Sequence, residues 1–488
     1  MPTRLCDAAL ATLTHASVPQ YDRSRLQPGI VHFGVGNFHR AHQAVYLDTL
    51  FGLGRDFAYG IVGAGVRAGD VAMRDALASQ SYLTTVVEQA PSVSRARVTG
   101  AMVDFAPVGD APAIIARLAD PATRIASLTV TEGGYYLDAD GAFDADHPEI
   151  RADAATPDAP KTVFGLIAAA QKVRRDAGLS PFTVMSCDNI PHNGAVARAA
   201  VTGVAELTDA GLADFIAQNV AFPNAMVDRI TPATSEREHT FLRDEFGIED
   251  AWPVFCEDFT QWVLEDTFSN GRPALDEVGV EFVTDVSPFE TMKIRILNGG
   301  HAVMAYPAGL LGIEFAHEAM EDTQIQAFLR KVEEEEILPI VPPVPNTDLG
   351  AYFETIVARF ANPKIGDTNR RLCFDGSNRQ PKFIVPSVRD RLASGAGVAG
   401  LALESALWCR YCAGTTEAGE AIVPNDPHWD DLTALAGRAK DDPTAWLSME
   451  PVYGDLAQAT AFRAPFEQAL RALWSDGVRA VLARYLAG

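Results

Sequence analysis

The stretch GIVHFGVGNFHR (29–40) decides the first half of the fold. Its opening residues, 29–33, are apolar and predict a short buried β-strand, and a loop that contains Gly34 and Gly36 follows at once. Such a turn between a strand and a helix lets the backbone approach a pyrophosphate, and the helix N-terminus adds free N–H groups and a positive dipole. Position 39 is a histidine where the usual G-x-G-x-x-G motif has its third glycine. The loop alone therefore fits either a nucleotide site or a purely geometric tight turn.

Charged residues near this loop favour a dinucleotide. The cationic side chains of His39 and Arg40 suit a diphosphate. The first carboxylate after the second predicted strand is Asp70, which would disfavour NADP if it reached the ribose 2′-hydroxyl, although Arg67 nearby has the opposite effect. The sequence therefore predicts NAD as the cofactor. The residues expected to bind it are Gly34, Gly36, Phe38, His39, Arg40 and Asp70.

Outward from this loop, strand-like and helix-like segments alternate. This alternation predicts a Rossmann-like, doubly wound parallel sheet with helices on both faces. Further strands are expected within 254–283. The predicted strands are Gly29–Phe33, Phe57–Val62, Ile125–Val130 and Pro181–Ser186, and the helices between them include Pro112–Leu118 and Val163–Ala177.

The pattern changes at SPFE (287–290), which predicts a helix start with Ser287 as N-cap, proline at the first helical position and a glutamate three residues after the cap. Helical periodicity dominates from there on. We therefore expect a NAD-binding domain at 1–286 and a mainly α-helical substrate domain at 287–488. The four glutamates of 333–336 are expected to form a solvated helix end.

Composition excludes several classes of function. The formal net charge of −24 over 488 residues, without a basic patch, argues against nucleic-acid binding. Cys409 and Cys412 form a CxxC within a predicted helix, and two half-buried thiols explain it better than zinc does, because further ligands are absent. No signal peptide or membrane span is visible. We expect a cytoplasmic protein without a metal site, as a monomer or a small homo-oligomer.

The segment ETMKIRILNGGH (290–301) is the strongest candidate for catalysis. On an α-helix, Asn298 and His301 would lie about 140° and about 80° round from Lys293. A lysine in a dry site can accept a proton from an alcohol, and an amide can donate a hydrogen bond to the alkoxide that forms. The same residues also fit a surface lysine, a helix end and a core histidine. Two other polar stretches, SCDNIPHNG (186–194) and FPNAMVDRITP (222–232), fit either ligand binding or turn chemistry.

Together these segments resemble the long-chain, polyol-specific dehydrogenases, the family that includes the mannitol 2-dehydrogenases and the hexuronate reductases. AWPVFCEDFTQWVLED (251–266) is most similar to the mannitol branch. The resemblance spans most of the chain in the order of the family. The segments that carry it are GVGNFHRAHQA (34–44), TEGGYYL (131–137), SCDNIPHNG, FPNAMVDRITP, the lysine segment and DGSNRQPKF (375–383).

The resemblance implies a role for each matching residue. Lys293 matches the general base, Asn189 and Asn298 match the two amides of the oxyanion hole, and Glu290 matches a glutamate that relays the proton to water. Arg379 stands where the family usually has a lysine, and its planar, delocalised charge can change substrate preference. The residues that match substrate-binding positions are His301, Asp228 and Arg371, with Arg379 beside them.

The implied reaction is metal-independent oxidation of a secondary alcohol of a polyol to a ketose, such as D-mannitol to D-fructose. D-arabinitol and D-sorbitol are alternative substrates. A hexuronate reductase of the same family is a second interpretation, because Arg371 and Arg379 could bind a carboxylate. A non-catalytic NAD-binding redox sensor is a third, but the lysine and both amides are present. A sugar-phosphate dehydrogenase would need a phosphate-binding cluster that the sequence does not show.

Overall fold

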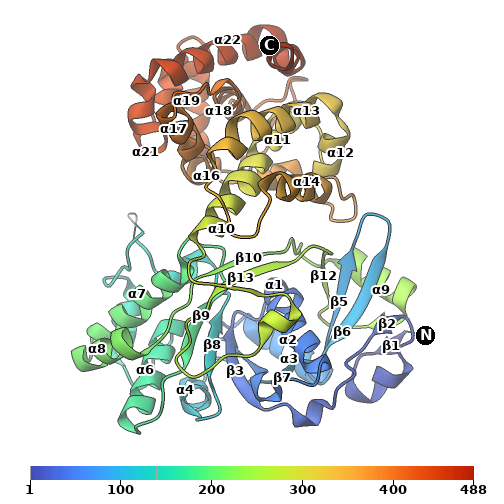
Figure 1. Cartoon of the computed structure of the whole chain (residues 1–488), viewed down its shortest axis with the longest axis vertical. Coiled ribbons are helices and arrows are strands. Elements are labelled where there is room, and N and C mark those ends of the chain that lie inside the picture. Colours follow the sequence, from blue (N-terminus) through green and yellow to red (C-terminus); the bar gives the residue numbers. More distant parts are fainter. Residues whose placement is uncertain (1, 139–140) are drawn as a thin grey trace. The chain divides into compact units, whose positions relative to one another are not determined.

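The computed structural model describes residues 2–138 and 141–488, and the chain divides into two compact units, Met1–Ser287 and Pro288–Gly488 (Figure 1). The division falls in the first turn of a helix that begins at Ser287. No helix in the described part of the chain is long and apolar enough to cross a membrane.

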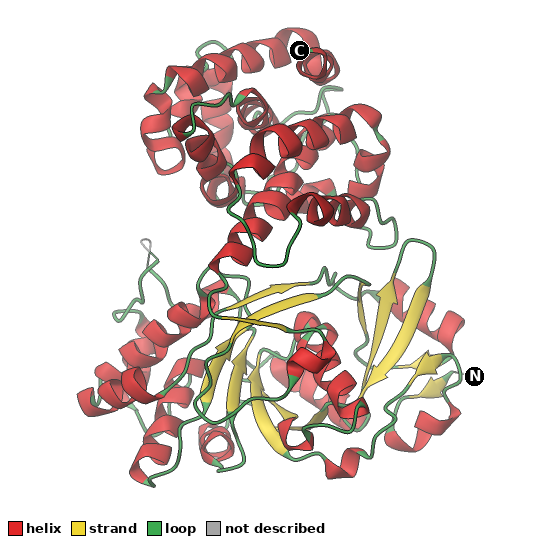
Figure 2. Cartoon of the chain, viewed as in Figure 1, coloured by secondary structure: helices red, strands yellow, loops and turns green. Residues whose placement is uncertain are grey.

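A five-stranded parallel sheet forms the centre of the first unit (Figure 2). Its strand order is β7-β4-β3-β8-β9, so the first strand lies in the middle and the chain adds strands on both sides. This order is the doubly wound arrangement of dinucleotide-binding domains, and it confirms the predicted fold class. The strands are β3 (Pro28–Phe33), β4 (Gly60–Ala64), β7 (Met102–Phe105), β8 (Ile125–Leu128) and β9 (Thr183–Ser186).

Helices cover both faces of this sheet because successive strand residues point to opposite sides. Ile30 packs in one core cluster with helices α2 and α3, whereas Val31 packs in another with α4, α6, α7 and α8. The helices of this unit are α1 (Asn37–Ala41), α2 (Gln43–Gly52), α3 (Asp70–Ser79), α4 (Ala111–Ala119), α5 (Pro148–Ala155), α6 (Val163–Asp176), α7 (Asn193–Glu206), α8 (Ala210–Asn219) and α9 (Glu236–Phe246).

Three smaller sheets complete the first unit. Their orders are β1-β11, β10-β13-β14 and β12-β5-β6-β2. In the second of these, β10 and β13 are antiparallel and β13 and β14 are parallel. The strands are β1 (Thr3–Arg4), β2 (Ala16–Ser17), β5 (Thr84–Gln89), β6 (Ser94–Thr99), β10 (Ala225–Asp228), β11 (Ile248–Glu249), β12 (Val254–Glu257), β13 (Gln261–Glu265) and β14 (Glu281–Val283).

The second unit is helical throughout its regular structure, as predicted. Helix α18 lies at its centre, packs against α11 and α22, and is buried along nearly its whole length. The α-helices are α10 (Ser287–Met292), α11 (Gly299–Leu310), α12 (Ala316–Glu321), α13 (Thr323–Val332), α14 (Leu349–Phe360), α15 (Asn369–Leu372), α16 (Gly376–Phe383), α17 (Val385–Ala393), α18 (Ala399–Cys412), α19 (Trp429–Ala439), α20 (Thr444–Leu447), α21 (Glu450–Tyr453) and α22 (Thr460–Ala487). Two π-helical segments, η6 (Lys293–Asn298) and η7 (Glu333–Ile337), extend α10 and α13.

Three local predictions were wrong. The second strand begins at Gly60 and not at Phe57, because 57–59 form a 3-10 turn after Asp56, whose φ is 53°. Cys409 and Cys412 are fully buried and not half-buried, because α18 is a core helix. The glutamates of 333–336 are not a uniformly solvated helix end, because Glu333 and Glu336 are buried.

Candidate active site

The glycine loop after β3 has the geometry of a nucleotide cradle. Gly34 has a φ of +87°, and a Cβ there would meet the Thr129 carbonyl oxygen at 2.1 Å. The Thr129 hydroxyl donates to the Gly34 carbonyl over 2.7 Å, which fixes the loop against the end of β8. Gly36 is the N-cap of α1. The loop therefore needs glycine at 34 and leads into a helix N-terminus, the arrangement that binds phosphate groups.

His39 and Arg40 lie inside the unit. Both side chains are completely buried, and the His39 ring stacks on His32 with 3.4 Å between ring centroids. Burial, followed by the proximity of His32, holds the pKa of His39 well below its usual range, so the ring is neutral. The Arg40 guanidinium donates to the Gly36 carbonyl over 3.3 Å and to the Asn37 amide oxygen over 2.9 Å. These two side chains support the loop from the interior of the unit. Because both are buried, they do not fit a direct ionic contact with a diphosphate.

Asp70 lies where the sequence places the ribose-binding carboxylate, just after β4. It is the first residue of α3, and its carboxylate accepts a hydrogen bond from the Arg67 N–H over 3.0 Å. A Cβ on Gly65 would meet the Asp70 carboxylate at 2.6 Å, so the 65–70 turn closes tightly around this side chain. The carboxylate is therefore fixed at the C-terminal end of the second strand of the central sheet.

Asp188 shapes the SCDNIPHNG segment after β9, a role that was not predicted from the sequence. Its buried carboxylate accepts from the N–H groups of Val130 and Thr131 (3.0 and 2.7 Å) and from the Tyr135 hydroxyl (2.6 Å). These bonds join the ends of β8 and β9 and hold Thr131, a β-branched residue, at a φ of +67°. Asn189, the next residue, is exposed at this edge of the sheet. The TEGGYYL motif (131–137), which follows the neighbouring strand β8, contains two of the bonding partners of Asp188. It was the sequence signal from which this connection could have been predicted.

Asp228 ends β10 and is buried. It pairs in register with Gln261 of β13. The first unit thus holds the glycine loop and Asn189 at ends of the central sheet and Asp228 on the β10-β13-β14 sheet. Among the described residues, no group of three or more His, Cys, Asp or Glu side chains has the geometry to hold a metal ion.

The lysine segment in the second unit is π-helical and not α-helical. The π-helix covers Lys293–Asn298, and the Gly299 N–H donates to the Ile294 carbonyl, a bond across five residues. Because residues five apart stack in a π-helix, Asn298 lies nearer to the side of Lys293 than the expected α-helix would place it. Single π-helical turns occur often at functional sites.

Lys293 and Glu290 are buried, with exposures of 7% and 8%. This burial excludes an ordinary surface lysine. His301 stacks on Phe360 with ring centroids 4.2 Å apart, which fixes the plane of the imidazole. The carboxylate of Asp285 accepts from the Ser287 N–H over 2.9 Å at the start of α10.

Arg371 and Arg379 also belong to the second unit but differ in their partners. Arg371 forms a two-pronged ion pair with Asp367, and this hydrogen-bonded contact raises the pKa of Arg371. Arg379 donates to the Leu372 carbonyl over 3.2 Å. The charge of Arg371 is therefore already balanced by a carboxylate within the protein.

Comparisons with known proteins cover both units. A family model described as the mannitol dehydrogenase Rossmann domain matches residues 28–277, and one described as the mannitol dehydrogenase C-terminal domain matches residues 285–474. A mannitol 2-dehydrogenase of Cereibacter sphaeroides is 60% identical over 470 residues, with 96% of this chain and 98% of that protein covered. A mannitol 2-dehydrogenase of Pyricularia oryzae is 40% identical, with 99% and 98% covered.

Solved structures show the same similarity. Mannitol 2-dehydrogenase of Pseudomonas fluorescens, in a ternary complex with NAD and D-mannitol, matches with a TM-score of 0.87 and 43% identity over 99% of this chain and 100% of that one. A D-sorbitol dehydrogenase matches with a TM-score of 0.92 and 34% identity over 98% and 100%. The fold and the matched domains define a two-domain dehydrogenase with a Rossmann unit and a helical unit. The chain belongs to the mannitol dehydrogenase family.

Proposed function

We propose that this enzyme oxidises a secondary alcohol of D-mannitol to the ketone of D-fructose, with Lys293 as the general base. The broader statement, that it is an NAD-dependent polyol dehydrogenase, rests on its family and on the NAD and mannitol complex of its relative from Pseudomonas fluorescens. The observation that carries the proposal is the buried lysine on a π-helical turn that also bears Asn298.

The base must be an unprotonated amine. Lys293 lies in a buried segment, where a charged ammonium is less well solvated than in water. It takes the hydroxyl proton as the carbon–hydrogen bond breaks, and Glu290 passes that proton to water. Oxidation should therefore rise toward alkaline pH, whereas ketose reduction, which needs the protonated lysine, should prefer lower pH.

The developing alkoxide needs hydrogen-bond donors. The amide groups of Asn189 and Asn298 provide them in this mechanism and take the place that a zinc ion has in other alcohol dehydrogenases. A fixed donor stabilises charge without reorganising at the moment of reaction. The mechanism thus requires no metal.

The glycine cradle fits NAD. The close approach of Gly34 to Thr129 leaves room only for backbone, and the first turn of α1 would hold the pyrophosphate together with Gly36 and Phe38. Asp70 would hold the adenosine ribose, and buried Arg40 and His39 keep the loop in shape. NAD supplies the nicotinamide ring that accepts the hydride.

His301, Asp228, Arg371 and Arg379 are proposed to bind the remaining hydroxyl groups of the substrate. The pairing of Arg371 with Asp367 favours a neutral polyol over a hexuronate, because a guanidinium that already has a carboxylate partner attracts a second one weakly. This contact supports the polyol over the hexuronate interpretation.

The test is a spectrophotometric assay in EDTA with NAD and, separately, mannitol, arabinitol, sorbitol and mannonate. We expect NADH formation with a polyol, unaffected by EDTA, and a loss of about 10²- to 10⁴-fold in kcat for Lys293→Ala. Lys331→Ala is the matched control, since Lys331 donates to the Tyr485 carbonyl in the same unit and has no proposed role in the reaction. Turnover with mannonate alone would assign the enzyme to the hexuronate reductases, and an active Lys293→Ala variant would exclude the lysine mechanism.

A further inference from the structure

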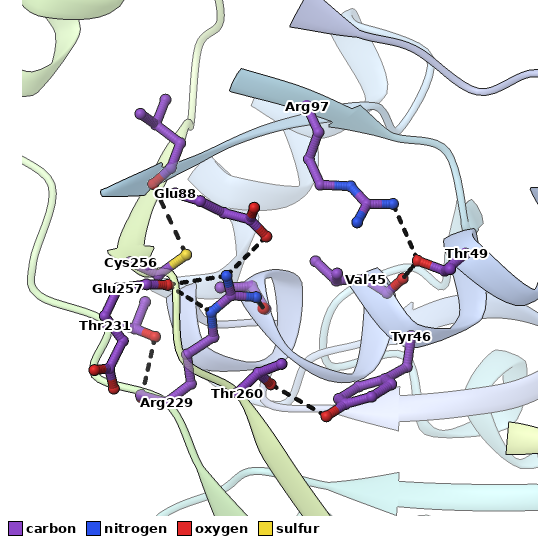
Figure 3. A network of polar contacts seen from close by, with 12 residues as sticks. Val45, Tyr46, Thr49, Glu88, Arg97, Arg229, Thr231, Cys256, Glu257 and Thr260 are labelled. Carbon is purple, nitrogen blue, oxygen red and sulfur yellow. Dashed lines mark hydrogen bonds and ion pairs between the residues drawn. The ribbon is translucent and has the colours of Figure 1, made fainter. Parts of the chain in front are cut away.

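Arg229 follows Asp228 in the chain and is a buried charge with four hydrogen bonds. Its side chain is 1% exposed. The guanidinium donates to the Glu257 carbonyl (3.1 Å from Nε, 2.9 Å from Nη2), to the Ala41 carbonyl (2.6 Å from Nη1) and to the Glu88 carboxylate (2.8 Å from Nη2). Figure 3 shows this side chain directed between Glu88 and Glu257.

The acceptors of Arg229 come from three separate elements. Glu88 lies on β5, Glu257 ends β12, and Ala41 is the last residue of α1. A carbonyl at a helix C-terminus lacks a partner within the helix, and a cation there is favoured by the helix dipole. Arg229 therefore binds the far end of the helix whose first turn belongs to the glycine loop.

The near end of the same helix is bound to the same segment. The Asn37 amide at the start of α1 donates to the Pro232 carbonyl over 3.2 Å. Helix α1 is thus attached at both ends to residues 229–232, which directly follow Asp228.

The backbone of this segment is fixed as well. The Glu257 N–H donates to the Ile230 carbonyl over 3.0 Å, and the Glu257 carboxylate accepts from the Ile230 N–H over 2.5 Å. Glu257 is 1% exposed. The backbone of residues 229 and 230 therefore has little freedom to rotate. The same holds for the end of β10 at the preceding residue, Asp228.

We propose that Arg229 is a positioning residue that couples the cofactor loop to the polyol-binding aspartate. Its guanidinium fixes the orientation of α1 and the end of β10 together, so that a change at one alters binding at both. This inference rests on the proposed function for the polyol, but its cofactor half is measurable without any polyol. Lysine cannot replace the residue, because a single ammonium group cannot reach three acceptors in the fixed directions of a guanidinium.

Two constants are measured for each variant: the Kd for NADH, by fluorescence without polyol, and the KM for mannitol at saturating NAD. For Arg229→Lys we expect both to rise about tenfold, and kcat to change less, because uniform binding is lost and the lysine base is intact. Glu88→Gln removes only the ionic contact and keeps the backbone acceptors, so both constants should rise about two- to threefold. The matched control is Arg97→Lys, because Arg97 donates to Asp48 and Thr49, which both lie on α2. Both constants should be unchanged in it.

A rise in one constant without the other in a folded Arg229→Lys variant would overturn the coupling. Should that variant fail to fold, as judged by circular dichroism, Glu88→Gln decides: parallel small rises support the inference, and two unchanged constants overturn it. If the wild-type protein bound NADH but did not oxidise polyols, the proposed substrate would be refuted. The Kd values of the variants for NADH would still test whether Arg229 positions α1.

Discussion

Two buried ionisable side chains, one in each unit, have opposite surroundings. Arg229 in the first unit donates to two carbonyl groups besides its ion pair with Glu88, all within 3.1 Å. Glu333 in the second unit is completely buried, and neither of its carboxyl oxygens has a hydrogen-bond partner in the described part of the chain. The first group keeps its charge, whereas the second avoids it: burial raises the pKa of Glu333 well above its usual range, so the carboxyl is protonated.

The difference shows what each buried side chain contributes to its unit. The arginine connects strands and a helix that lie far apart in the sequence. Glu333 instead lies against the lysine segment, since a Cβ on Gly300 would meet one of its carboxyl oxygens at 3.0 Å. A paired charge orders its surroundings, and an unpaired acid leaves a polar group whose burial lowers stability.

The largest effect is expected when the paired charge is removed. Arg229→Met leaves the Glu88 carboxylate and two buried carbonyl groups without their donor, which should lower the free energy of unfolding by about 3–5 kcal/mol. Urea unfolding followed by tryptophan fluorescence measures it. Arg97→Met is the comparison, because Arg97 is partly exposed, and its ion pair should contribute about 1 kcal/mol or less. Equal losses of unfolding free energy in the two variants would mean that the buried contacts of Arg229 stabilise the protein no more than a partly exposed ion pair does.

A gain in stability is expected when the unpaired acid is removed. Glu333→Met keeps the volume and removes the buried carboxyl, so it should raise the free energy of unfolding by about 1–3 kcal/mol near neutral pH. The folded protein holds this proton to a higher pH than the unfolded chain does, so wild-type stability falls as pH rises above the ordinary value of 4.5. The advantage of the variant should therefore grow from pH 5 to pH 8, as followed by unfolding at a series of pH values. A constant difference over that range would show that Glu333 is ionised in the folded state.

The smallest effect concerns a neighbouring carboxylate that does have partners. Glu336 accepts from the N–H groups of Gly400 and Leu401, at 2.6 and 3.0 Å, and so caps the first turn of α18. Glu336→Ala removes this cap and should cost about 1 kcal/mol. Exposed Glu335 gives the matched control, and Glu335→Ala should leave the midpoint of thermal unfolding unchanged. If the midpoint were as low in Glu335→Ala as in Glu336→Ala, the loss of stability would come from removing a negative charge from this helix and not from removing the cap.

The central sheet could be predicted because each of its strands is an apolar run followed by a turn or a helix signal. Strands β5 and β6 were missed, although TTVVEQ and SRARVT alternate around a PSVS turn, because their polar residues weaken the apolar signal. The run of glutamates misled for a physical reason: Glu333 and Glu336 are three residues apart and share one side of the helix, toward the core.

The site residues could be found only as separate motifs. Local patterns identified the glycine loop and the lysine segment, but the π-helical geometry at Lys293 has no simple sequence signal. The burial of Arg40 and the network of Arg229 depend on partners more than a hundred residues away, such as Trp252 and Ala41. Such contacts follow from tertiary structure and not from periodicity.

The π-helical turn at Lys293–Asn298 also limits how the sequence of this chain can change in evolution. A π-helical turn holds one residue more than the α-helical turn it interrupts, so the spacing of Lys293, Asn298 and His301 depends on chain length as well as on residue identity. Loss of a single residue from this stretch would keep every proposed catalytic side chain and still rotate those after the gap by about 100° relative to those before it. Insertions and deletions here are therefore expected to be tolerated far less than substitutions at positions such as Ile294, and a relative of different length in this stretch would have a different arrangement of the same residues.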